Sequence, residues 1–334
     1  MIPQSDIIVL PVEDEWPHAP ETDEAWQESV VLCFQDVEKR LGGFIRLGHH
    51  PNRGTGNCTF GVVAPGGGYN RSRIDVPMRD GDRFDKGFAI DGFVNATFGP
   101  AASRWTAEDN DCALDLEVEN LHPHYDAWAL AGLTGGFREK FAAMHTEVAG
   151  RVRGTMRIGN ENWIVDGWGF RDHSWGVRKH DDPDAALATF FWLVGSFGPD
   201  FVFSMSESIT FSGKRNRTGF VIREGTFARP VTQDARFGVT LDGMTMRDAL
   251  VAFDAGPLGE HSVALEGLGN VLLGMGGRYL EVGMPAIGRW NGRTGGVHLS
   301  TMFNARGGTG QPPMLFGTSA ANGLYRTKDF QQVG

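Results

Sequence analysis

Short apolar runs bounded by glycine, proline or asparagine recur along the chain from residue 29 onward. SVVLCF, NCTFGVVAP and TGFVIREG are runs of this kind, and they are rich in β-branched and aromatic residues. Such runs predict short β-strands separated by tight turns. In ALDLEVEN, residues 113–120, leucine and valine alternate with acidic residues. This alternation predicts a strand with one buried face and one acidic, solvated face.

A longer alternating segment predicts a β-hairpin. EVAGRVRGTMRI, residues 147–158, is followed by the turn sequence GNEN and by the returning run NWIVDGWGF. Arg151, Arg153 and Arg157 share one face of the first strand. These three arginines form either a solvated strand face or a stripe that holds a carboxylate.

The whole pattern predicts an all-β protein of two β-barrel or sandwich domains. A chain of 334 residues is longer than one ordinary domain. Its 47 glycines are spread along the whole length, as the turns of a many-stranded protein require. The acidic, proline-containing segment HDDPDAAL, which begins at residue 180, has the composition of a loop. We therefore expect one domain over residues 1–180 and a second over residues 181–334.

Charge and hydropathy exclude several kinds of partner. The formal net charge is −10 and no long basic stretch is present, which argues against nucleic acid and anionic membrane surfaces. No apolar run approaches the ~20 residues that span a bilayer. The first residues resemble no targeting signal, and three widely spaced cysteines favour a reducing compartment. We therefore expect a cytoplasmic protein.

Motifs for nucleotides and metals are missing from the sequence. The chain has no GxGxxG between a strand and a helix, no P-loop, no GxSxG and no HExxH. We therefore expect neither a cofactor nor a metal. His122 and His124 have a spacing that zinc enzymes use, but no third ligand completes the set.

The strongest site candidate is the segment DGWGFRDHSWGVR, which ends at Arg178. In an extended chain Trp168, Phe170 and Asp172 share one face. An aspartate beside two aromatic rings is poorly solvated when it is ionised, so its pKa should rise into the range of a usable general acid. The alternative is that Asp172 forms an ion pair with Arg171 or Arg178 and has a structural role.

Two further residues are candidates for acid–base work. In DFVFSMSESI, Glu207 falls on the same alternating face as Phe203. An acid on an apolar strand face is uncommon, so Glu207 is a candidate second acid or base. A strand-end slip or bulge would instead place Glu207 in solvent. His173 is either a partner that orients Asp172 or a core histidine that joins two strands.

One part of this sequence resembles a known family. The pattern E-x-x-G-x-V-x-G, then a hairpin, then G-x-x-D-H-x-W-G occurs here as EVAGRVRG, NWIVDGWGF and RDHSWGVR. It resembles the AttH-like and carotenoid 1,2-hydratase superfamily. GRYLEVGMPAIGRWNGRTGG in the second half resembles a bacterial branch of that group. The resemblance covers the middle third of the chain most closely and the rest in general layout.

The resemblance implies two lipocalin-like β-barrels packed together, with an apolar tunnel or cavity and no cofactor. Relatives include hydratases that add water to prenyl double bonds and fungal cyclases that catalyse Diels–Alder reactions. In the hydratases, the aspartate of the D-H-x-W-G element is the expected proton donor, and Asp172 occupies that position here. Phe170 stands where the hydratases carry a tyrosine.

We therefore expect a cofactor-independent hydratase, dehydratase or isomerase that acts on a hydrophobic isoprenoid-like or polycyclic substrate. Asp172 is the expected proton donor, with His173 and Glu207 as further catalytic groups. The expected walls of the substrate site are aromatic: Trp168, Phe170, Trp175 and Phe203. Two alternatives stay open, a pericyclic-type cyclase that folds its substrate in an apolar cavity and a non-catalytic carrier of a hydrophobic small molecule. The sequence indicates no oligomeric state.

Overall fold

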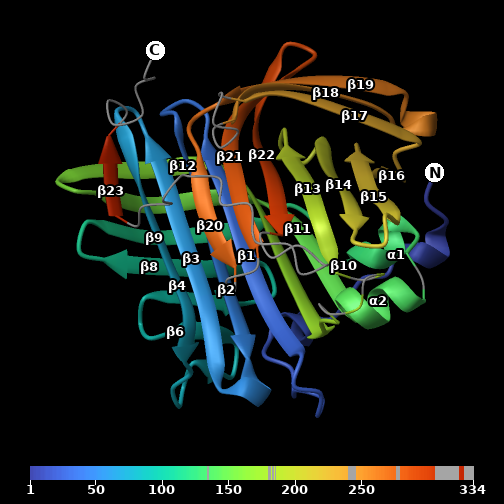
Figure 1. Ribbon diagram of the computed structural model, residues 1–334. Coiled ribbons are helices and arrows are strands. Elements are labelled where there is room, and N and C mark those ends of the chain that lie inside the picture. Colours follow the sequence, from blue (N-terminus) through green and yellow to red (C-terminus); the bar gives the residue numbers. More distant parts are fainter. Residues whose placement is uncertain are drawn as a thin grey trace.

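Two curled antiparallel sheets make up most of the protein (Figure 1). The structure is a computed structural model that describes residues 1–133, 135–179, 182, 184, 186–239, 246–275, 279–304 and 323–326. Within these residues the first sheet has 13 strands and the second has 10. The predicted all-β class, with two lipocalin-like units, is confirmed. None of the described helices is long and apolar enough to cross a membrane.

The first sheet runs in the order β23-β4-β3-β2-β1-β12-β11-β9-β8-β7-β6-β5, with β10 paired to β11. Its strands are β1 (Trp26–Asp36), β2 (Leu41–His50), β3 (Thr55–Ala64), β4 (Gly67–Pro77), β5 (Arg83–Phe84), β6 (Gly87–Ile90), β7 (Val94–Phe98), β8 (Ala102–Asp109), β9 (Cys112–Asn120), β10 (Tyr125–Asp126), β11 (Met144–Ile158), β12 (Glu161–Val177) and β23 (Gly323–Arg326). The sheet curls until β6 faces β2 and β3 across an apolar core. Helices α1 (Ala127–Ala131) and α2 (Gly136–Phe141) lie between β10 and β11.

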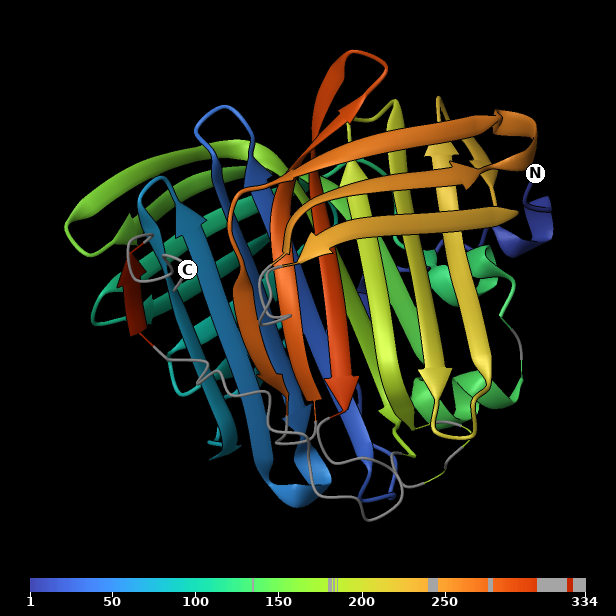
Figure 2. The ribbon, with the colours of Figure 1, turned by 45° about the horizontal axis from the view of Figure 1, so that its top comes forward.

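The second sheet runs in the order β16-β15-β14-β13-β22-β21-β19-β18-β17, with β20 paired to β21. Its strands are β13 (Leu187–Ser196), β14 (Phe201–Thr210), β15 (Arg215–Arg223), β16 (Thr226–Ala228), β17 (Thr232–Val239), β18 (Met246–Asp254), β19 (Glu260–Gly267), β20 (Val271–Met275), β21 (Tyr279–Trp290) and β22 (Arg293–Asn304). Strands β17–β19 arch across β13–β16, which encloses a second apolar core (Figure 2). The described residues also include four short 3₁₀ turns, at Gln4–Asp6, Val12–Glu15, Pro51–Arg53 and Gly256–Leu258.

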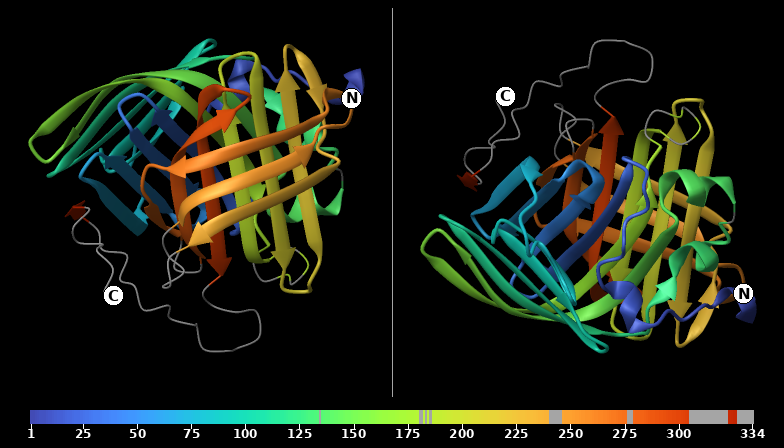
Figure 3. Two further views of the ribbon diagram at one scale, coloured as in Figure 1. Left: turned by 90° about the horizontal axis from the view of Figure 1, so that it is seen from above. Right: turned by 90° about the horizontal axis from the view of Figure 1, so that it is seen from below.

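The sheets lie side by side, and the strands at their junction are covered on both faces (Figure 3). Every residue of β1 is buried. Val30, Leu32 and Phe34 point into the first barrel, whereas Val31 and Cys33 join a third apolar cluster between the sheets. This double burial explains why SVVLCF is an unbroken apolar run, while β9 at the outside shows the predicted alternation of buried and solvated residues.

The predicted hairpin is confirmed, because β11 and β12 pair along their whole length. Its arginine stripe is a solvated face: Arg151 and Arg153 both form ion pairs with Asp166, and Arg153 also pairs with Glu119. The chain changes sheets between β12 and β13, and β23 returns to the first sheet beside β4. The domain division at residue 180 stays a prediction.

Glycines permit the close approach of the two sheets. A Cβ atom on Gly61 of β3 would lie 2.1 Å from Cγ1 of Val271 in β20 and 2.6 Å from Oδ1 of Asn70. A Cβ on Gly42 of β2 would lie 2.5 Å from Cβ of Pro285 in β21. Larger residues at these positions would therefore push the sheets apart.

We predict that Gly61→Ala destabilises the protein by about 1–3 kcal/mol, the usual cost of overpacking a filled core. Chemical denaturation measures this. Gly136→Ala is the matched control, because a Cβ on this glycine of α2 would have no neighbour within 4 Å. The double variant Gly61→Ala/Val271→Ala should be less destabilised than the sum of its single variants. Strictly additive effects would contradict a contact between the sheets at this point.

Candidate active site

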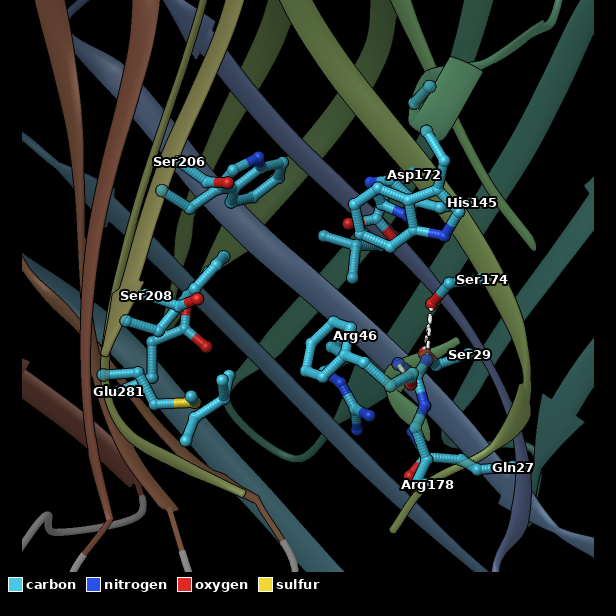
Figure 4. A pocket seen from close by; sticks show the side chains of 18 of the residues that line it. Gln27, Ser29, Arg46, His145, Asp172, Ser174, Arg178, Ser206, Ser208 and Glu281 are labelled. Carbon is cyan, nitrogen blue, oxygen red and sulfur yellow. Dashed lines mark hydrogen bonds between the residues drawn. The ribbon is translucent and has the colours of Figure 1, made fainter. Parts of the chain in front are cut away.

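A cavity of about 790 Å³ lies between the two sheets, and both contribute to its walls (Figure 4). From the first sheet come Gln27, Ser29 and Val31 of β1, Phe44 and Arg46 of β2, His145 and Glu147 of β11, and Asp172 and Ser174 of β12. From the second come Phe190 and Trp192 of β13, Ser204, Ser206 and Ser208 of β14, Thr218 and Phe220 of β15, Glu281 of β21 and Met302 of β22. Helices α1 and α2 add Trp128, Lys140 and Phe141. The walls thus combine aromatic rings with many polar groups.

Asp172 reaches this cavity because β12 lies between β1 and β11, where Asp172 is opposite Val31 and Glu147. Burial raises the pKa of Asp172 to about 6. The nearby charge of His145 opposes this rise, while that of Glu147 adds to it. Among the described residues, none forms a hydrogen bond or ion pair with the Asp172 carboxylate. The carboxyl group is thus available to a bound molecule.

Glu147 is held by groups from both sheets. Its Oε1 accepts a hydrogen bond from the indole Nε1 of Trp192 at 3.1 Å and lies 3.2 Å from Nε2 of His145. Burial alone would lower the pKa of His145, but the hydrogen bond and charge of Glu147, with the charge of Asp172, raise it overall. His145 also packs on Trp128, with ring centroids 4.6 Å apart. A group able to hold a proton therefore lies beside Asp172.

The second sheet adds another acid and a series of hydroxyl groups. Burial raises the pKa of Glu281 to about 7, despite the opposing effects of Ser300 and Arg46. Ser204, Ser206 and Ser208 alternate along β14 and all face the cavity. The site can therefore exchange protons at two acids near neutral pH and can hydrogen-bond to hydroxylated molecules.

Several of the sequence-predicted residues lie elsewhere. Phe170 shares the face of Asp172 and packs in the apolar cluster between the sheets. Trp168 lies outside the lining, where the guanidinium of Arg151 is 4.6 Å from its ring centroid. His173 and Trp175 point into the first barrel, because neighbouring residues of a strand face opposite sides. The structure thus brings neither of these two residues together with Asp172.

Glu207 and Phe203 do share a face of β14, as the alternation predicted, but this face belongs to the interior of the second barrel. Phe203 is part of the barrel core. Glu207 lies farther along the strand, beside Arg215 at 3.4 Å and Arg217 at 2.5 Å. The prediction that Glu207 lies beside Asp172 is therefore wrong. The cavity is on the face of β14 that carries the serines, whereas Glu207 is on the opposite face.

One group of described residues presents atoms that could ligate a metal: His18, Glu28 and His173. Glu28 already accepts hydrogen bonds from His18 Nδ1 at 2.7 Å, His173 Nε2 at 3.0 Å and Arg83 Nη2 at 2.6 Å. A dication would be repelled by the guanidinium of Arg83, so the cluster fits a buried ion-pair network better than a metal centre. His122 and His124 do not face each other either: His122 Nε2 accepts from the Ala149 amide, whereas His124 contacts Arg171.

Sequence reasoning missed Arg46, Glu281 and the three serines. The sequence does contain a pattern that indicates the serines: in FSMSESI, serine occurs at every second position, so these residues share one face of a strand. Glu281 is the one charged residue of the run YLEVGM, and Arg46 that of GGFIRLG. A single charged residue inside an apolar run of a strand indicates a polar site on a buried face.

Residues 11–305 match the model of a family described as a domain of unknown function (DUF7064). A search among curated proteins found no match to the sequence. Solved structures of similar shape include a protein described as AttH from Nitrosomonas europaea, with a TM-score of 0.63 and 11% identity over 90% of this chain and 98% of that chain.

Two further similar structures carry more specific names. CghA, in a structure with Sch210972, has a TM-score of 0.55 and 9% identity over 87% of this chain and 94% of that chain. Kievitone hydratase from Nectria haematococca has a TM-score of 0.52 and 9% identity over 90% of this chain and 95% of that chain. At such low identities the likeness shows the fold, and it confirms the resemblance to AttH-like proteins at that level.

We predict that Asp172→Asn stabilises the folded protein at pH 7. The folded pKa of about 6 exceeds the ordinary 3.8, so ionisation of Asp172 costs stability as pH rises from about 4 to about 6 and remains costly above it. At about 1.4 kcal/mol for each pKa unit, the gain should be about 1–3 kcal/mol at pH 7 and should vanish near pH 3. Denaturant titrations across this pH range measure it.

Asp115→Asn is the control for that measurement, since Asp115 forms an exposed ion pair with Arg104 and its pKa is lowered by the hydrogen bond from that guanidinium. It should change stability by less than about 1 kcal/mol. A clear loss of stability in Asp172→Asn at pH 7 would show that Asp172 is a structural ion-pair partner.

For Glu28 we predict the opposite effect of substitution, a loss of stability at pH 7. Burial alone would raise the pKa of Glu28, but hydrogen bonds from His173 and His18 and the charges of His173 and Arg83 hold it at about 2. Its stabilising effect is complete above the ordinary pKa of 4.5 and is lost as pH falls toward 2. Glu28→Gln should cost about 3–5 kcal/mol at pH 7, because buried positive partners lose their counter-charge.

Glu119→Gln is the matched control for Glu28→Gln. Glu119 and its partner Arg153 are 61% and 59% exposed, so the loss should stay below about 1 kcal/mol. Equal effects of the two substitutions would contradict a structural role for the Glu28 network.

Proposed function

We propose that this chain, which belongs to the family of the DUF7064 domain, is an acid–base enzyme that transfers a proton between Asp172 and a small molecule held between the two sheets. One observation carries the proposal: the Asp172 carboxyl faces the cavity, has no partner among the described residues, and has a pKa of about 6. A buried structural acid is normally paired, and pairing lowers its pKa. An unpaired acid with a raised pKa is the arrangement of a general acid.

The proposed reaction is the addition or removal of water, or the shift of a double bond, on a hydrophobic isoprenoid-like or polycyclic substrate. Asp172 donates its proton to an alkene carbon, or to a hydroxyl group that leaves as water. The resulting cation is stabilised by the faces of aromatic rings such as Trp128 and Trp192. Water then adds and returns a proton to the carboxylate, or the carboxylate removes a proton from a neighbouring carbon.

Glu281 is the proposed second acid–base group, in place of Glu207. It lines the same cavity from the second sheet, and its pKa of about 7 leaves both protonation states populated at neutral pH. Kievitone hydratase, which has a similar fold, supports the proposal by its name, and CghA by its structure with a small molecule. The serines of β14 favour a substrate that also carries hydroxyl groups.

Solvent deuterium provides the test. Small molecules that co-purify with the protein are identified by mass spectrometry and then incubated with it in D₂O, with kievitone and linalool as defined probes. We predict that the wild-type protein places deuterium on carbon and that Asp172→Asn slows this by about 10²–10⁴-fold, the usual contribution of a general acid. Glu207→Gln, which alters an acid outside the cavity, should leave the rate unchanged.

The alternatives give different results in the same assay. A cyclase that acts only by folding its substrate would keep near-full turnover in Asp172→Asn and would place no deuterium on carbon. A carrier would release a stoichiometric, unaltered ligand and show no turnover in any variant. Either result would refute the proposed proton transfer.

A further inference from the structure

Arg46 is placed in the cavity by β2, with its guanidinium group over a glycine. Phe44, Arg46 and Gly48 share one face of this strand. A Cβ on Gly48 would lie 3.0 Å from Nη1 and 3.1 Å from Nη2 of Arg46. The absence of a side chain at Gly48 therefore makes the space in which the guanidinium lies.

The guanidinium of Arg46 has no partner within the part of the chain that the structure describes. Among the described residues, none forms a hydrogen bond or ion pair with Arg46. Glu281 and Asp172 are the nearby acids, yet burial raises the pKa of both, to about 7 and about 6. A carboxylate in tight contact with a guanidinium would have a lowered pKa instead. Five N–H donors, arranged in a planar fork, are thus available to a molecule in the cavity.

The register of the strands fixes how far Arg46 lies from Asp172. Val31 of β1 is opposite Arg46 on one side and opposite Asp172 on the other. Arg46 and Asp172 are therefore two strand spacings apart on one face, or about 10 Å between Cα atoms. A ligand group bound at Arg46 would orient the remainder of the molecule along this row toward the proposed proton donor.

We propose that Arg46 is an anion-binding subsite that selects substrates carrying a carboxylate. The planar guanidinium fork matches the two oxygens of a carboxylate, which it binds in bidentate fashion. The other described cations of the lining are engaged or exposed. Arg178 donates a hydrogen bond to Ser174, Lys140 and Lys179 form ion pairs with Asp182 and Asp23, and Arg53 is exposed. Arg46 is therefore the favoured position for an anion in the cavity. The inference rests on the proposed function in assuming that the same cavity holds the substrate.

Retinoic acid and retinol test the proposal, because they share an isoprenoid skeleton and differ in the carboxylate. Binding is followed at pH 7.5 by quenching of tryptophan fluorescence, to which Trp128 and Trp192 in the cavity wall contribute. We expect the wild-type protein to bind retinoic acid about 10- to 100-fold more tightly than retinol, as charge-assisted hydrogen bonds imply. Farnesoic acid and farnesol, measured by calorimetry, repeat the comparison with a shorter skeleton.

Substitutions assign the preference to Arg46. Arg46→Met should bring acid and alcohol within about two-fold of each other, while Arg46→Lys should keep part of the preference. Gly48→Ala should weaken binding of the acids and leave the alcohols unchanged, since it displaces the guanidinium. Arg104→Met is the control, because Arg104 is 63% exposed and pairs with Asp115 on the outer surface.

The outcomes separate this inference from the proposed function. Asp172→Asn should slow deuterium transfer by about 10²–10⁴-fold and retain the preference for acids, so either property can fail without the other. A preference that survives in Arg46→Met would overturn the anion subsite, as would equal binding of acid and alcohol by the wild-type protein. Failure of both acids to bind would overturn it as well.

Discussion

Burial of β1, β2 and β12 on both faces is the constraint on which the rest of the structure depends. These strands belong to the first sheet, but their outer faces are covered by β13, β21 and β22 of the second. One set of side chains must therefore fill the first barrel and the alternate set must meet the other sheet. The cavity lies within this second layer, and both sheets contribute polar side chains to its walls.

Buried acids on the two sides of these strands differ in their partners and in the direction of their pKa shifts. On the inner face, Glu28 is bound by three side chains and its pKa is held at about 2. Glu15 likewise lies 2.5 Å from Arg171. Burial alone would raise the pKa of Glu15, but the charge and hydrogen bond of Arg171, with the charges of His124 and His173, lower it overall. On the outer face, burial raises the pKa of Asp172 in β12, and it also raises the pKa of Glu281, which faces the same cavity from β21 of the second sheet. Burial is comparable, so the presence or absence of partners decides the sign of the shift.

This contrast distinguishes structural from chemical roles within a few residues of one strand. His173 joins strands through Glu28, while Asp172, its neighbour in sequence, faces an open cavity. Two buried acids with raised pKa values, of which Glu281 has a hydrogen bond with Ser300, are a cost to folding that three apolar clusters can offset. Native proteins accept such local costs where a group must remain available for binding or chemistry.

The sequence by itself determined the strands, the long hairpin and the residues that share a face, because side-chain alternation has a period of two. It also made Asp172 the candidate proton donor, because its aromatic neighbours indicate a poorly solvated carboxyl. Alternation cannot say what covers a face, so it could not separate the interior of a barrel from the junction between sheets. That is why Phe203 and Glu207 were assigned to a site from which their strand turns them away. Only the tertiary structure, which brings β2, β14 and β21 to the same cavity as β12, placed Arg46, the serines and Glu281 there, since contacts between distant strands leave no local pattern.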